Sequence, residues 1–364
     1  MNNRRTTIGV FHVGALGDCI LALHVARAVA GSARFAGRDG PAEVIAIARS
    51  PVARLAVGRS VVGAYRDLDA ADMSALFAPG NGRNAPGPAA MRAMQDLDGI
   101  VSFCGGPDVP PTTRLREITN VSIWAIDPRV RPETVAAGRH ITEQWISDLR
   151  TIGLDVPPPE PTTLIRLADA DCEYGRRRWA GVAGLHRESS TAPEALKKPD
   201  GNGAKGISSA ASGADCRRVL LHPGSGGRAK CWALDRFEAL ADRLRANGHM
   251  VAWMIGPVEM DWYGESLRER LARTADVIYE EDLVRAASVI AAADVFVGND
   301  SGAVHLAAAL GVATVAVFVA TAASVWRPIG RAVRTVGGSE GGYGPCSVAV
   351  CDVSSAVAEA YARR

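Results

Sequence analysis

The sequence is poor in aromatic residues and almost free of lysine. Aromatic residues make up 5% of its 364 residues, against 48% for hydrophobic residues as a whole. We therefore expect a core built mainly from Ala, Val, Leu and Ile. Of the 41 basic residues only four are lysines, at positions 197, 198, 205 and 230. Scattered arginines thus reflect the overall composition, and a lysine inside a motif carries more information.

Long apolar runs and an excess of charge are missing as well. No run approaches the roughly 18 apolar residues that span a membrane, and the segment after Arg5 is broken by His12, Gly14 and Asp18, unlike a signal peptide. The net charge of +2 gives no nucleic-acid signature. We expect a soluble, cytoplasmic protein without a nucleic-acid partner. Peripheral contact with the inner face of the cytoplasmic membrane stays open.

The cysteines lack the spacing of a metal site. The seven cysteines include no CxxC pair, and no His/Cys cluster accompanies Cys346 and Cys351. Zinc sites show paired, regularly spaced ligands. We therefore expect reduced thiols and no metal site.

The most informative stretch is a short apolar strand, residues 295–297, that runs into a Gly-Asn-Asp-Ser-Gly turn at 298–302. An Ala/Leu-rich helix follows, and Gly311 ends it before a second apolar run at 312–319. Strand, turn, helix and strand form the repeating unit of a parallel α/β sheet. Ligands of such sheets bind beyond the carboxyl ends of the strands, which is where this turn lies.

The same turn predicts an anion site. Asp300 and Ser301 are good N-cap residues. The free N–H groups of a first helical turn, together with the helix dipole, attract phosphate groups. His305 lies one turn further along, on the face that Ser301 begins. The alternative interpretation is a capped helix with a packed histidine.

A second glycine turn follows the first predicted strand, residues 7–13. It reads Gly14-Ala15-Leu16-Gly17-Asp18 and leads into an amphipathic helix over 19–30. Gly14 and Gly17 permit positive φ and a close approach to a ligand. Asp18 is either an N-cap or a carboxylate held over a cleft. The turn is not a GxGxxG fingerprint, which argues against a dinucleotide-dependent oxidoreductase.

Strands and helices alternate along the chain, which predicts an α/β protein with parallel sheets. We expect a first domain over 1–183 and a low-complexity linker or insertion over 184–216. A second domain would follow over 217–345, and a tail helix over 346–364, for which packing back on the first domain is open. Further strands are expected at 43–48, 61–68, 99–103, 121–126, 219–222, 250–255 and 277–279.

Five segments together carry a resemblance to a known family. They are Gly14-Ala15-Leu16-Gly17-Asp18; His222-Pro223-Gly224-Ser225 with Lys230 and Trp232; Gly256-Pro257 with Glu259; residues 298–302 with His305; and Phe318 with Thr321, Trp326 and Pro328. In order and spacing, over about residues 7–330, they resemble glycosyltransferase family 9, the heptosyltransferases of lipopolysaccharide core synthesis. The resemblance implies the GT-B fold, in which two Rossmann-like domains with parallel sheets face each other across a cleft. The first domain would then bind the acceptor and the second the nucleotide sugar.

The resemblance also implies an activity. A sugar is moved with inversion from a nucleotide diphosphate sugar, typically ADP-heptose, to a saccharide or glycolipid acceptor, without metal or cofactor. Asp18 matches the family's general base, a role that needs a carboxylate facing the acceptor hydroxyl. The implied donor-binding residues are Ser225, Lys230, Glu259, Asp300, Ser301, Gly302 and His305.

The leaving diphosphate accounts for most of these residues. Lys230 would supply a positive charge, and the N–H groups of Ser301 and Gly302 would supply preorganised donors. Ser225 and His305 would add hydrogen bonds to the diphosphate.

Two acidic residues and two glycines complete the implied site. The Glu259 carboxylate would accept from ribose hydroxyls. Asp300 would lie near the donor sugar, or it would simply cap the helix. Gly14 and Gly17 belong to the turn on the acceptor side.

Two positions depart from the family pattern. His24 stands where a proline is usual, and Phe318-Val319-Ala320-Thr321 replaces the usual Phe-Gly-Pro-Thr. The altered Phe318 loop leaves open a catalytically silent sugar-nucleotide-binding protein. A UDP-sugar epimerase of the same fold is a further open interpretation. Retention of both Asp18 and Lys230 favours transfer.

Overall fold

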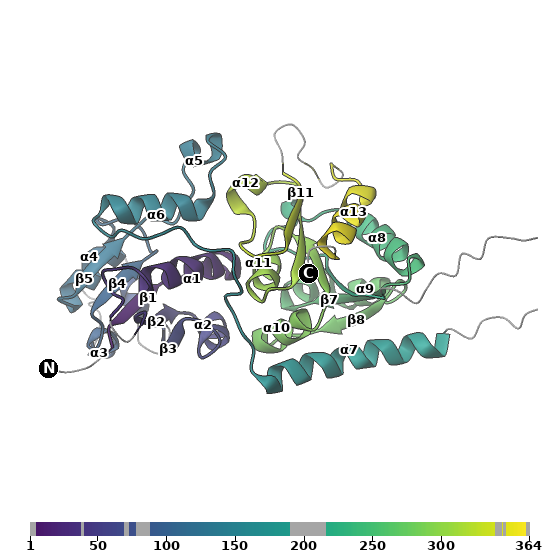
Figure 1. The fold of residues 1–364 in the computed structure, drawn as a ribbon, viewed down its shortest axis with the longest axis horizontal. Coiled ribbons are helices and arrows are strands. Elements are labelled where there is room, and N and C mark those ends of the chain that lie inside the picture. Colours follow the sequence, from purple (N-terminus) through teal and green to yellow (C-terminus); the bar gives the residue numbers. More distant parts are fainter. Residues whose placement is uncertain are drawn as a thin grey trace, which may run out of the picture.

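A computed structural model describes residues 5–37, 40–68, 73–77, 88–189, 216–338, 344 and 347–361. Most of the predicted low-complexity stretch, residues 190–215, lies outside this part of the chain. The described chain forms two α/β domains that lie side by side (Figure 1).

The N-terminal sheet has five parallel strands in the order β3-β2-β1-β4-β5. Each strand lies where the sequence predicts one, because a short apolar run is followed by a polar or glycine turn. The strands are β1 (Thr7–Phe11), β2 (Glu43–Ala48), β3 (Val62–Asp67), β4 (Gly99–Ser102) and β5 (Ser122–Ala125). The helices of this half are α1 (Leu16–Ala30), α2 (Ser50–Ala56), α3 (Pro88–Met94), α4 (Pro110–Ile118), α5 (Pro132–Ala136) and α6 (Ile141–Thr151), with a 3-10 turn η1 at Met73–Phe77.

The C-terminal sheet has six parallel strands in the order β11-β10-β9-β6-β7-β8. The strands are β6 (Arg218–His222), β7 (Met250–Ile255), β8 (Asp276–Tyr279), β9 (Val295–Asn299), β10 (Ala313–Phe318) and β11 (Val333–Gly337). The associated helices are α7 (Asp169–Ser189), α8 (Leu234–Ala246), α9 (Pro257–Leu271), α10 (Leu283–Ala291), α11 (Gly302–Ala309), α12 (Ala323–Trp326) and α13 (Val350–Tyr361), with a 3-10 turn η2 at Arg228–Lys230. The edge strand β11 is not predicted above, because its residues are only partly buried and show no apolar run.

The two sheets share a continuous apolar core. The main cluster runs from β1 and α1 through α11 into the C-terminal sheet. Helix α1 packs directly on α11 at the centre of the molecule (Figure 1). At the far end of this helix pair the connecting chain is tied to α11, since the N–H groups of Leu164 and Ile165 both donate to Ala309 O. At the other end of the pair, α1 and α11 begin shortly after the carboxyl ends of β1 and β9. The contact between the two helices thus brings these strand ends near each other.

One predicted domain boundary is wrong, and the open question of where the tail helix packs is answered. Helix α7 begins inside the predicted first domain but packs on α10, and its Trp179 indole donates to Val289 O at 3.0 Å. The chain thus crosses between the domains before Asp169, not after residue 183. The tail helix α13 packs on α8, β10 and β11 of the C-terminal domain rather than back on the N-terminal domain. Its buried Val353 and Val357 join the second apolar cluster there.

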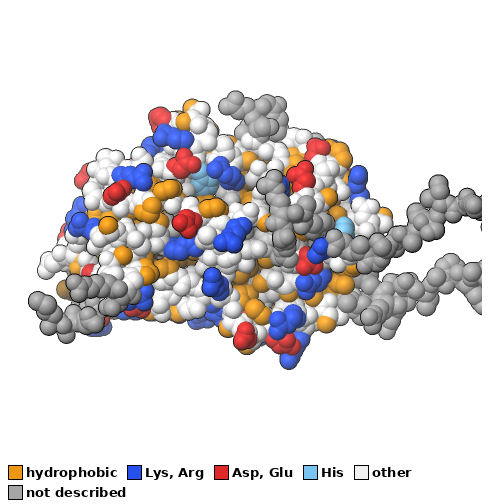
Figure 2. Space-filling model, in the orientation of Figure 1, with side chains coloured by type: hydrophobic (Ala, Val, Ile, Leu, Met, Phe, Trp, Pro, Cys, Tyr) orange, Lys and Arg blue, Asp and Glu red, His pale blue; other side chains and the backbone are white. Residues whose placement is uncertain are grey.

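One face of the molecule agrees with the balanced charge of the sequence. On the face seen in Figure 2, basic and acidic side chains alternate, and neither sign forms an extended patch. Among the helices described, none is both long enough and apolar enough to cross a bilayer.

Candidate active site

Two glycines allow the N-termini of α1 and α11 to touch. A Cβ atom added at Gly302 would lie 2.7 Å from Leu16 Cβ and 3.1 Å from Gly17 N. One added at Gly17 would lie 3.1 Å from His305 Cδ2. Neither Gly14 nor Gly17 adopts the positive φ that a glycine permits. Their value lies in close packing instead.

A cavity of about 380 Å³ opens where these helix ends meet. Both domains contribute to it, so it is an interdomain site. It brings together eight of the ten predicted site residues, whereas Gly14 and Glu259 are not part of its lining. The lining residues are Ala15, Gly17, Asp18, Ser225, Gly226, Gly227, Lys230, Asp300, Ser301, Gly302, His305 and Trp326.

Asp18 lies in the first turn of α1 and faces this cavity. It is not the N-cap: that residue is Ala15, whose N–H donates back to the Asp18 carboxylate. Burial raises the pKa of Asp18 above its usual value. The Ala15 N–H and Lys230 oppose that rise, and Asp300 adds to it. A partly desolvated carboxylate of this kind is a stronger base than an exposed aspartate.

The N-terminus of α11 is not capped by the side chain of its own N-cap residue. Ser301 occupies the N-cap position but makes no capping hydrogen bond, so the interpretation as an ordinary capped helix is wrong. Among the described residues, neither Ser301 Oγ nor the buried His305 Nδ1 finds a hydrogen-bond partner. Burial lowers the pKa of His305 to about 4, which keeps its ring neutral. Unpaired buried polar atoms beside uncapped N–H groups indicate a site that a polar ligand completes.

Asp300 takes a role different from the predicted cap. Its Oδ2 atom lies 2.9 Å from Lys230 Nζ and accepts from Thr321 Oγ1 at 2.6 Å. Its backbone carbonyl accepts from the Ser225 hydroxyl at 2.7 Å. The proton of Ser225 is therefore engaged in joining two loops, and only its lone pairs face the cavity. Although the loop sequence before Thr321 is altered, Thr321 still holds Asp300.

One supporting residue does not appear among the predicted site residues. Asn299 is fully buried, and its side chain accepts from Trp232 N at 2.8 Å and donates to Pro223 O at 2.7 Å. It thereby fixes the β6 loop, which carries Lys230, to the β9 turn. An asparagine inside a Gly-Asn-Asp-Ser-Gly turn is the signal that points to such a role.

Glu259 lies apart from the other predicted residues. Its Oε2 accepts from Gly256 N at 2.8 Å, which caps α9, and the residue is 3% exposed. It borders a separate cavity of about 210 Å³ between the β6 loop and α9, which Trp232 and Tyr263 also line. The predicted contact with a ribose would have to be made from that side.

Three solved structures of glycosyltransferases resemble this chain over nearly its whole length. The ADP-heptose lipopolysaccharide heptosyltransferase II of E. coli superposes with a TM-score of 0.65 at 15% identity, covering 98% of this chain and 99% of that one. A family 9 glycosyltransferase of Veillonella parvula gives 0.67 at 15% identity, covering 100% and 99%. The E. coli heptosyltransferase WaaC with ADP gives 0.60 at 13% identity, covering 98% and 100%. The predicted GT-B fold is therefore confirmed.

Sequence comparison adds the family. No curated protein matches this sequence. The family described as glycosyltransferase family 9 (heptosyltransferase) matches residues 131–356, which is more than half of the chain. The match includes Lys230 and the 298–302 turn but begins after Asp18. The protein therefore belongs to glycosyltransferase family 9 and is a glycosyltransferase.

Proposed function

We propose that this protein transfers a heptose with inversion from ADP-heptose to a saccharide or glycolipid acceptor of the cell envelope. The observation that carries the proposal is the interdomain cavity. In it the Asp18 carboxylate of one domain faces Lys230 and the uncapped N-terminus of α11 in the other. A base and an anion site on opposite walls suit a displacement at a sugar carbon between them.

Asp18 acts as the general base in this proposal. It takes the proton of the acceptor hydroxyl as that oxygen forms its bond to the anomeric carbon. The bond from that carbon to the diphosphate breaks, and its electron pair leaves with the diphosphate. Attack opposite the leaving group inverts the anomeric configuration. A positioned base of this kind contributes roughly 10²- to 10⁴-fold to the rate.

The leaving diphosphate is stabilised by the opposite wall. The N–H groups of Ser301 and Gly302 and the dipole of α11 favour an anion there. Lys230 adds a mobile positive charge, which in the free protein is balanced by Asp300. When the diphosphate binds, it shares Lys230 with Asp300. Ser301 Oγ and His305 Nδ1 have no hydrogen-bond partner within the described part of the chain, and in this proposal they bond the diphosphate oxygens.

The donor and acceptor are named from the relatives. The two E. coli neighbours are described with ADP-heptose and with ADP, which supports an adenine nucleotide donor here. Glu259, which borders the separate cavity between the β6 loop and α9, is the proposed ribose contact. The acceptor would bind on the N-terminal domain beside Asp18. A glycolipid acceptor would place the protein at the inner face of the cytoplasmic membrane.

Calorimetric titration tests the donor. The purified protein is titrated with ADP, UDP, GDP and dTDP in turn, without added metal, and then assayed for transfer from the matching nucleotide sugar. We expect selective binding of ADP. Selective binding of another diphosphate would replace the donor, and binding of none would contradict the proposal.

The pH dependence of transfer tests the base. Transfer needs ionised Asp18, so we expect kcat/KM to fall as pH falls through its raised pKa, above the ordinary 3.8. Lys230 lowers this pKa and Asp300 raises it. The acid limb should therefore move to higher pH in Lys230→Met and to lower pH in Asp300→Asn. Shifts in the same direction, or no shift in either variant, would contradict the assignment.

A further inference from the structure

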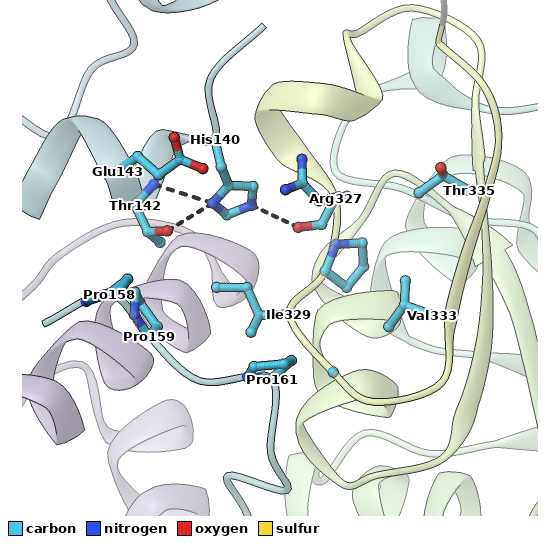
Figure 3. A pocket seen from close by; sticks show the side chains of 12 residues that line it. His140, Thr142, Glu143, Pro158, Pro159, Pro161, Arg327, Ile329, Val333 and Thr335 are labelled. Atoms are coloured by element: carbon cyan, nitrogen blue, oxygen red, sulfur yellow. Dashed lines mark hydrogen bonds between the residues drawn. The ribbon is translucent and has the colours of Figure 1, made fainter. Parts of the chain in front are cut away.

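A second interdomain cavity, of about 360 Å³, lies between the start of α6 and the segment that leads from α12 to β11. Prolines 158, 159 and 161 of the connecting chain form its floor in Figure 3. His140 bridges its upper edge, and dashed lines join its ring to Thr142 on one side and to Arg327 on the other (Figure 3). The residue is only 3% exposed.

The hydrogen bonds of His140 define the protonation of its ring. The N–H of Thr142 donates to His140 Nδ1 at 3.3 Å, which caps α6, so Nδ1 carries no proton. Burial lowers the pKa of His140 to about 4, so the ring is neutral and its single proton is on Nε2. From there it is donated to Arg327 O at 2.9 Å, across 187 positions of sequence. One side chain thus caps a helix of the N-terminal domain and binds a carbonyl of the C-terminal domain.

The carbonyl that His140 binds ends a weakly supported segment. Helix α12 has only four residues, too few to be stable alone. Its N–H groups at 325, 326 and 327 bond back to Ala322 and Ala323. The last residue of α12, Trp326, lines the cavity of about 380 Å³ that also contains Asp18 and Lys230, which we call the donor cavity. Gly138 also lies beside this helix, because a Cβ added there would come within 3.7 Å of Ser324 Oγ.

We propose that His140 is a positioning residue that tethers the N-terminal domain to the segment carrying Trp326, so that the donor cavity is completed only when both domains hold this segment. The tether is the bond from His140 Nε2 to Arg327 O. The hydrogen bond between the domains does not depend on which nucleotide sugar the protein binds. Its effect on donor binding rests on the proposed function.

Two substitutions separate the tether from the helix cap. His140→Asn keeps an acceptor at the position of Nδ1 and has no atom at the position of Nε2; asparagine is also a favoured N-cap. His140→Gln places an amide nitrogen near the position of Nε2 and lacks the Nδ1 acceptor. Asp282→Asn is the matched control, because Asp282 caps α10 away from both cavities by accepting from Arg285 N.

Hydrogen exchange of the free protein tests the tether directly. In His140→Asn we expect faster exchange at the amides of 325–327 and unchanged exchange in α6. In His140→Gln we expect faster exchange at the start of α6 and unchanged exchange at 325–327. Unchanged exchange at 325–327 in His140→Asn would overturn the tether. So would faster exchange of α6 with no change at 325–327, since His140 would then be only a cap.

Steady-state kinetics test the consequence for the donor. We expect the donor KM of His140→Asn to rise roughly 2- to 12-fold, the loss of one neutral hydrogen bond, with kcat little changed. His140→Gln and Asp282→Asn should stay near wild type. A donor KM in His140→Asn equal to that of Asp282→Asn would overturn the positioning role. A wild-type protein that binds no nucleotide would refute the proposed function, and the exchange experiment would still decide the tether.

Discussion

Asp18→Asn is expected to reduce transfer by roughly 10²- to 10⁴-fold while donor affinity stays close to wild type. Asparagine has the shape of aspartate but cannot take the proton of the acceptor hydroxyl. Its side-chain oxygen can still accept the Ala15 N–H that the carboxylate holds at the start of α1. The fold of this turn and the anion site on the opposite wall should therefore persist. The measurement is kcat with saturating donor and acceptor, beside calorimetric titration with the donor nucleotide.

An exposed aspartate supplies the control for this variant. Asp155 pairs with Arg150 on the surface, and its side chain is 94% exposed. Asp155→Asn should transfer at the wild-type rate. Near-normal turnover in Asp18→Asn would remove Asp18 from the role of base. Loss of both turnover and nucleotide binding would instead mean that Asp18 supports the cavity rather than the chemistry.

The turns at 14–18 and 298–302 could be predicted from the sequence because each combines strong local signals. An apolar strand precedes each turn, glycines lie within it and an apolar helix follows. Such signals depend on neighbours in the chain, so they survive without knowledge of the fold. The pairing of the two turns follows once both are placed at the carboxyl ends of parallel strands. That is why eight of the ten predicted site residues line one cavity.

The hydrogen-bond partners inside the site could not be predicted in this way. Asp300 looks like a helix cap by its position, yet its carboxylate binds Lys230 and Thr321. Both partners are distant in sequence, and their approach depends on the packing of three loops. Glu259 matched the family pattern in sequence, but its carboxylate turns to the N-terminus of α9. A motif identifies the residue and its loop, whereas the competing partners decide where the side chain points.

The domain boundary was misplaced for a related reason. Helix α7 follows the last element of the N-terminal domain in sequence, and nothing in its own pattern tells which sheet it covers. Its partner becomes evident only from contacts with residues far along the chain, such as Tyr174 OH donating to Glu280 Oε1 at 2.6 Å. The chain crosses to the second domain before α7, but its composition changes only after α7. A domain boundary placed by composition therefore falls too late in the sequence.

Lys230→Met is expected to weaken binding of the donor diphosphate by about 1.5–3 kcal/mol, or about 10- to 150-fold in Kd. The substitution removes a charge-assisted hydrogen bond and keeps an unbranched side chain of similar length. The N–H groups at the start of α11 remain, so binding should be weakened and not abolished. Calorimetric titration with the preferred nucleoside diphosphate measures the change. Arg243→Met, which removes a positive charge from an exposed position on α8, should bind like wild type.

The ion pair with Asp300 gives this prediction a second part. In Lys230→Met the Asp300 carboxylate loses the positive charge that balances it. It then repels the negatively charged diphosphate. Asp300→Asn removes that repulsion, and the amide oxygen of the new side chain can still accept from Thr321. The double variant Lys230→Met/Asp300→Asn should therefore bind the diphosphate more tightly than Lys230→Met alone. A double variant that binds no better would mean that Asp300 lies outside the electrostatic reach of the bound diphosphate. Wild-type affinity in Lys230→Met would remove this lysine from the donor site altogether.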